Sequence, residues 1–185
     1  MSDVTLILRA IDRGDKHASQ ELLPLAYDEL RRLASSQMSN QAANQTLQPT
    51  ALVHEAWLRL VKEADRTWHN REHFFRTAAL AMRQILVDRA RQKLSLKHGQ
   101  GAEKVSLENL DITAPISDDR VLLVDQNLDR LEKEDPESAR LINLKFFAGL
   151  TNKEVANILG ITERSVERQW AYARSRLYKL IQEEI

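Results

Sequence analysis

Apolar residues recur at helical spacing through most of the chain, and one polar segment separates them into two groups. The first group lies within residues 1–97 and the second within residues 119–185. Residues 98–118, between them, contain two glycines and one proline and show no sustained helical period. We therefore predict an all-α protein of two small helical domains, residues 1–97 and 119–185, joined by a flexible linker at residues 98–118.

The first half of the chain is expected to hold several helices separated by polar segments. Apolar spacing predicts two helices before residue 34, and residues 35–48, rich in Ser, Asn and Gln, indicate a loop. Thr50 is expected to cap a helix over residues 51–63, and Asn70 to cap the next one. That last helix continues to residue 97, with or without a break near Arg83.

Residues 149–168 carry the pattern of a helix-turn-helix. Thr151 and Glu154 have the spacing of a capping box, which fixes where a helix begins. Gly160 is suited to the left-handed turn that ends a helix, and Thr162 is placed to cap the next one. The second helix of such a unit can enter the major groove of DNA. The alternative interpretation is a helical hairpin with a solvated charged face.

The two faces of that second helix differ in character. Its apolar face is formed by Val166, Trp170, Ala173 and Leu177. The residues left toward solvent, which we predict to contact DNA, are Arg164, Ser165, Glu167, Arg168 and Tyr172. In the commonest repressor-type pattern an apolar residue lies three positions after the central valine, which is Val166 in this chain. That position is occupied by Gln169, and the apolar residue, Trp170, comes one position later. We therefore expect a rotated or differently supported recognition helix.

Net charge, the length of apolar runs and cysteine content restrict the classes of protein to which this chain can belong. The 185 residues carry no net charge, so an argument for nucleic-acid binding has to come from local patches. No apolar run approaches the roughly 20 residues that span a bilayer, which predicts a cytoplasmic protein without membrane insertion. The absence of cysteine excludes disulfides and thiolate zinc sites.

A basic stretch lies near the end of the first domain. Residues 76–97 contain six basic side chains and a single acidic one, Asp88. Trp68, Phe74 and Phe75 precede it, and cations beside aromatic rings are what single-stranded or melted DNA requires. Phenylalanines at helical spacing are more often core residues, so Trp68 is the aromatic residue that we expect at the surface. Upstream, residues 52–60 predict an amphipathic helix with His54, Glu55 and Arg59 outward, where they could dock a partner.

These segments together resemble an extracytoplasmic-function (ECF) sigma factor of bacterial RNA polymerase, over nearly the whole chain. Residues 52–59 are similar to the family's Leu-Val-Gln-Glu-x-Phe-Leu-Arg segment, and residues 85–91 and the C-terminal helix-turn-helix follow in the family's order. The resemblance implies that His54, Glu55 and Arg59 dock on core RNA polymerase. It implies that the first domain reads and opens the minus-ten element and the second reads the minus-thirty-five element of promoter DNA.

The resemblance also assigns residues to the minus-ten element. Gln84 falls where the family has an asparagine beside the pocket for a flipped-out base, whereas the family's usual tryptophan is replaced by Thr77. Cations near the upstream edge of the bubble would hold phosphates. The full minus-ten set is Trp68, Arg83, Gln84, Arg89, Arg91 and Lys93. The family often has an anti-sigma factor, and a free sigma factor could pack its two domains together and hide both DNA surfaces.

Two other functions compete with this interpretation. A helix-turn-helix regulator would use residues 1–97 for sensing or dimerisation, but the sequence shows neither a coiled coil nor an effector pocket. An enzyme is the third possibility, because His69 and His73 have the i, i+4 spacing of metal ligands. The His-Glu-x-x-His motif is absent after His54, and no nucleophile constellation or phosphate loop appears. We therefore expect no catalysis, metal or cofactor in this chain.

Overall fold

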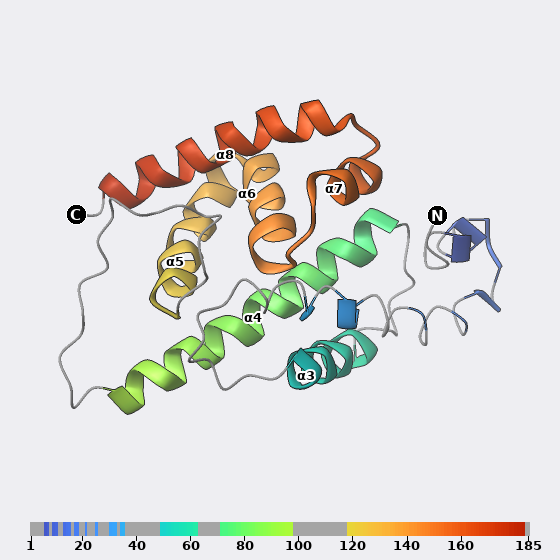
Figure 1. The fold of residues 1–185 in the computed structure, drawn as a ribbon, viewed down its shortest axis with the longest axis horizontal. Coiled ribbons are helices and arrows are strands. Elements are labelled where there is room, and N and C mark those ends of the chain that lie inside the picture. Colours follow the sequence, from blue (N-terminus) through green and yellow to red (C-terminus); the bar gives the residue numbers. More distant parts are fainter. Residues whose placement is uncertain are drawn as a thin grey trace.

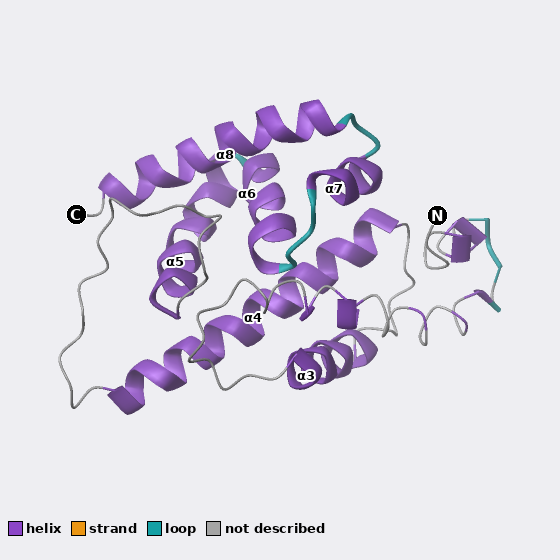
Figure 2. Cartoon of the chain, viewed as in Figure 1, coloured by secondary structure: helices purple, strands orange, loops and turns teal. Residues whose placement is uncertain are grey.

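A computed structural model describes residues 49–62, 71–97 and 118–183, with scattered positions between residues 6 and 35. The described residues form helices, turns and no strand, which confirms the all-α prediction (Figure 2). Trp68, His69 and Asn70 lie outside the described residues. The predicted linker lies outside them too, except for Asp118.

Two helices represent most of the described N-terminal half, α3 (Pro49–Lys62) and α4 (Arg71–Lys97). The prediction that Thr50 caps α3 is wrong, because the helix begins at Pro49. Proline suits a first turn, since its missing N–H needs no partner there and its φ is already helical. Helix α4 runs for 27 residues, about 40 Å, without a break near Arg83. It contains no glycine or proline that would interrupt it.

The C-terminal half begins with two helices that meet at a sharp boundary, α5 (Asp118–Glu134) and α6 (Pro136–Ile142). The side chain of Asp135 accepts a hydrogen bond from the N–H of Ser138 at 3.1 Å, so it caps α6. After α6 the helix widens into a π-helix, η2 (Asn143–Phe147).

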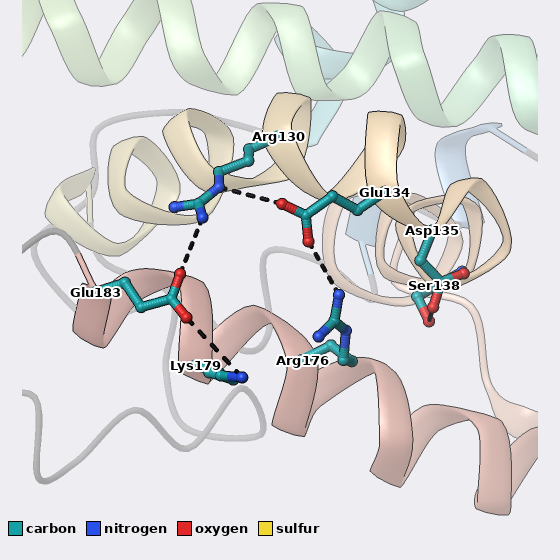
Figure 3. A network of polar contacts seen from close by, with 7 residues as sticks. All are labelled: Arg130, Glu134, Asp135, Ser138, Arg176, Lys179 and Glu183. Carbon is teal, nitrogen blue, oxygen red and sulfur yellow. Dashed lines mark hydrogen bonds and ion pairs between the residues drawn. The ribbon is translucent and has the colours of Figure 1, made fainter.

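Helices α7 (Asn152–Leu159) and α8 (Glu163–Glu183) complete the fold, and α8 lies across α5, α6 and α7 (Figure 1). Ion pairs join the C-terminal end of α5 to the C-terminal half of α8 (Figure 3). Arg130 bridges Glu134 and Glu183, at 3.2 and 2.9 Å, and Arg176 reaches the second oxygen of Glu134 at 2.9 Å. These half-exposed pairs form a network, which fixes the direction of α8 better than isolated surface pairs would.

Helix α4 lies between α3 on one side and α5, η2 and α7 on the other (Figure 1). One apolar core therefore extends from the N-terminal to the C-terminal half. Phe74 and Phe75 are both 1% exposed and meet edge to face, with ring centroids 5.2 Å apart. Both belong to the core, as their spacing predicted, and neither offers a stacking surface for a base. Phe147 on η2 is fully buried in the same cluster.

Candidate nucleic-acid interface

The start of α7 is fixed by the capping box that the sequence predicted. Glu154 accepts hydrogen bonds from the backbone N–H of Thr151 at 2.7 Å and from its hydroxyl at 2.8 Å. The N–H of Glu154 donates to the same hydroxyl at 3.3 Å. Gly160 then ends the helix with a left-handed φ of 67°, as expected. Local sequence therefore sets both ends of the short helix that supports α8.

Glu154 also carries an electrostatic link to the N-terminal half of the chain. Its second oxygen lies 2.5 Å from Arg32. Burial alone would raise the pKa of the Glu154 carboxyl. The hydrogen bonds from Thr151 and the charge of Arg32 outweigh burial and lower that pKa below its usual value. The carboxylate is thus held in its charged form.

The beginning of α8 presents the predicted DNA-contacting face to solvent. Thr162 accepts a hydrogen bond from the N–H of Ser165 at 3.2 Å, which confirms it as the cap. The Ser165 hydroxyl lies 2.9 Å from that of Thr162, so this side chain helps to build the cap. The other predicted residues project from exposed positions, namely Arg164, Glu167, Arg168 and Tyr172. Within the described residues, neither Arg164 nor Arg168 makes an ion pair.

The aromatic residue that departs from the repressor pattern supports α8 in an unusual way. Gln169 is exposed, and Trp170 is half-buried and lies close to two cations. The Lys145 ammonium lies 5.3 Å from the indole centroid and the Arg174 guanidinium 5.7 Å. Lys145 also donates to the side chain of Asn152 at 2.5 Å, so it ties η2 to both α7 and α8. Burial, and then repulsion from Arg174, lowers the pKa of Lys145.

Arg83, predicted to contact the minus-ten element, is enclosed by the C-terminal half instead. Its side chain is 9% exposed. Nε donates to Asp125 at 2.7 Å, and Nη2 donates to Asp129 at 2.5 Å and to the carbonyl of Asp125 at 3.1 Å. The guanidinium also lies 5.8 Å from the ring centroid of Phe147. Burial opposes its charge, but the hydrogen bonds that Arg83 donates to Asp129 and Asp125 outweigh burial and raise the pKa of Arg83.

Two further cations of the predicted minus-ten set are paired with α5. Arg91 Nη2 lies 3.4 Å from Asp125, and Lys93 Nζ lies 3.3 Å from Asp118. Arg91 is nevertheless 63% exposed, whereas Lys93 is 31% exposed. Phosphates could therefore still approach Arg91. Sequence reasoning missed the acidic partners, although two of them share the i, i+4 spacing that places residues on one helix face.

The residues predicted to dock on a partner lie along the contact between α3 and α4. His54 is exposed. Glu55 accepts a hydrogen bond from Arg89 at 2.7 Å, and Arg59 donates to Gln84 at 3.0 Å and to Asp88 at 3.1 Å. Two residues of the predicted minus-ten set, Gln84 and Arg89, thus lie beside two of the predicted docking residues.

A groove of about 300 Å³ opens beside the side chain of Gln84. The Thr77 hydroxyl donates to the carbonyl of His73 at 2.9 Å, so it is occupied by its own helix. The exposed Arg76 supplies a cation at the rim. The groove is lined by Arg59, Leu60, His73, Arg76, Thr77, Leu80, Ala81 and Gln84. Its donors, acceptors and apolar wall suit a planar polar ligand such as a nucleobase.

Comparison with known proteins points to one family. A family model described as "ECF sigma factor" matches residues 1–183. A search of curated proteins finds no matching relative. Among the described helices none is both long and apolar enough to cross a membrane, and the described residues hold no cluster of His, Asp and Glu suited to a metal ion.

Proposed function

Because the chain belongs to the ECF sigma factor family, whose members act in transcription initiation, we propose that it binds core RNA polymerase and directs recognition and melting of promoter DNA. The observation that carries this proposal is the exposed start of α8. Arg164 and Arg168 project there without ion pairs among the described residues, on a helix held by a capped neighbour. Such a helix can place guanidinium groups at guanine edges in the major groove.

The minus-thirty-five element is the proposed target of α8. Arg164 and Arg168 are spaced i, i+4, so they project from one helix face. Tyr172 continues that face by another turn and is 57% exposed. Glu167 can accept from a cytosine amino group, while Ser165 serves the cap of the helix.

The minus-ten element is the proposed target of α4. Gln84, Arg59 and the rim of the adjacent groove offer hydrogen bonds to a base edge. Arg89, Arg91 and Lys93 follow along the helix and would hold phosphates. Trp68 belongs to the same proposal, although it lies outside the described residues.

The α3 surface is the proposed docking site for core polymerase. His54 and Leu58 are exposed there, and the Leu58 side chain offers apolar area for a partner helix. Glu55 and Arg59 lie beside them on the same helix. An anti-sigma factor, which members of the family often have, is the proposed competitor for this surface.

Reconstitution with core RNA polymerase tests the proposal. The purified chain should co-elute with core enzyme on a sizing column and should initiate transcription from specific genomic fragments of its source. Glu55→Lys should abolish co-elution, whereas Glu137→Lys, an exposed change on α6, should not. A chain that binds a DNA site on its own and never binds core polymerase would instead be a helix-turn-helix regulator.

A further inference from the structure

Another cavity, of about 240 Å³, lies where α4 meets α5, α6 and η2. It adjoins the groove beside Gln84, because Arg76 and Leu80 line both. Leu80 and Leu144 give it an apolar wall. It is smaller than the ~300–1,000 Å³ pockets that hold drug-sized ligands, so it suits a small metabolite. Its lining residues come from four elements, which is why no single motif in the sequence marks it.

Side chains of opposite charge line this cavity without pairing. They are Arg76 on α4, Glu132 on α5 and Glu137 on α6, and all three are exposed. Within the part of the chain that the structure describes, none of them makes an ion pair. A ligand that carries both a negative and a positive group can attract both kinds of side chain, whereas a simple anion or cation is repelled by one of them.

Two residues of the cavity wall have buried polar atoms without a hydrogen-bond partner among the described residues. These atoms are Nε of Arg140, a donor, and Oδ1 of Asn143, an acceptor. Leaving such atoms unpaired is unfavourable, and Asn143 is only 6% exposed. The two residues are three positions apart where α6 runs directly into η2, so they lie on the same side of the helical segment. The wall thus offers one donor and one acceptor close together.

An α-amino acid carries the groups that complement this wall. Its carboxylate can accept a hydrogen bond from Arg140 and pair with Arg76. Its ammonium group can donate to Asn143 and pair with the carboxylates of α5 and α6. The carboxylate and the ammonium are bonded to the same carbon atom, so they are as close together as the donor and acceptor that they meet. The apolar wall is left to contact the side chain of the ligand.

We propose that this cavity binds a free α-amino acid, held by its carboxylate on the side of Arg76 and Arg140 and by its ammonium group on the side of Asn143, Glu132 and Glu137. This site goes beyond the proposed function, because it makes the chain a receptor for a small metabolite. Apart from Arg76, which also stands at the rim of the groove beside Gln84, none of its residues is assigned to DNA or core polymerase.

Calorimetric titration of the full chain with the natural L-amino acids, one at a time, tests the site. We expect at least one of them to bind with a Kd below about 1 mM and to raise the Tm through mass action. The corresponding 2-hydroxy acid lacks the ammonium group, and the amino acid amide lacks the carboxylate, so each should bind at least about tenfold more weakly. Absence of binding by every amino acid would overturn the inference. Equal binding of the 2-hydroxy acid would show a simple anion site and would overturn it too.

Two variants place the bound amino acid in this cavity. Asn143→Leu removes the buried acceptor at a similar size and should weaken binding at least about tenfold in the same titration. Glu137→Gln, at an exposed position, should weaken it roughly three- to tenfold and keeps the test valid if Asn143→Leu fails to fold. Glu163→Gln removes the same charge from an exposed position on α8 outside the cavity, and it should change the Kd less than about twofold.

Equal affinities of Glu137→Gln and Glu163→Gln would overturn the assignment to this cavity. Binding of core polymerase is a separate measurement on the same chain. A chain that binds polymerase but no amino acid leaves the proposed function intact, and a chain that binds an amino acid but never binds polymerase defeats only the proposed function.

Discussion

The capping box at the start of α7 makes a prediction about stability that can be worked out from individual contacts. Glu154→Ala removes two hydrogen bonds to Thr151 and the ion pair with Arg32. Loss of such hydrogen bonds costs roughly 0.5–1.5 kcal/mol each, and the half-exposed ion pair adds at most about 1 kcal/mol. Because water replaces part of what is lost at this exposed site, we expect about 1–2 kcal/mol in total, or a Tm lowered by roughly 2–8 °C.

The pH dependence of that effect separates the charge from the hydrogen bonds. The folded-state pKa of Glu154 is lowered, so its charge stabilises the fold fully above the unfolded carboxyl pKa of about 4.3. This contribution is lost as the pH falls through the lower folded-state pKa. Glu154→Gln keeps an acceptor for the capping box, so its deficit relative to the natural sequence should be largest at pH 7 and should disappear in strong acid.

Thermal and urea denaturation followed by circular dichroism would measure both effects. Lys153→Ala, at an exposed neighbour in the same turn, serves as the control and should melt within about 1 °C of the natural sequence. If Glu154→Ala melted with the control, the capping box would contribute nothing. If the deficit of Glu154→Gln persisted unchanged in strong acid, the cause assigned to the lowered pKa would be wrong.

Two further predictions concern the same unit. Arg168→Ala should lower the rate of initiation at promoters that depend on the upstream element roughly 5- to 150-fold, which corresponds to a loss of about 1–3 kcal/mol of binding free energy. Lys179→Ala, at the other end of α8, should not lower that rate. An equal loss on every DNA sequence would make Arg168 a phosphate contact. Gly160→Ala should lower the free energy of unfolding, measured by urea denaturation, by about 1–2 kcal/mol, because φ is +67° at this position although nothing lies within 4 Å of an added Cβ. Gly160→Asn should lower it less, since asparagine tolerates this conformation better. Equal stability of Gly160→Ala and the natural sequence would contradict this prediction.

The features that the sequence predicted well depend on neighbouring residues. The capping box of Thr151, the left-handed Gly160 and the cap at Thr162 each need only a few adjacent positions, and the structure contains all three. The burial of Phe74 and Phe75 follows from helical spacing alone. Such local rules apply whatever the rest of the chain does.

The features that it missed depend on distant residues. A basic residue on a helix reads as a surface cation, yet Arg83 is enclosed by two aspartates more than 40 positions away. The π-helix at residues 143–147 also makes contacts with other elements, since Lys145 within it reaches both α7 and Trp170. Neither arrangement can be predicted from one helix alone, because each is a product of packing between elements.

The position of α4 explains why one part of the candidate site is open to solvent and another part is covered. Its apolar residues pack against α3 on one side and against α5 and η2 on the other, so its polar residues are confined to narrow strips between neighbours. On the α3 side Arg59, Gln84 and Asp88 remain at the surface, beside a groove of about 300 Å³. On the α5 side Arg83 is buried with its carboxylate partners. A ligand can therefore enter beside Gln84, whereas Arg83 is enclosed by the carboxylates of α5 and is not accessible in this arrangement.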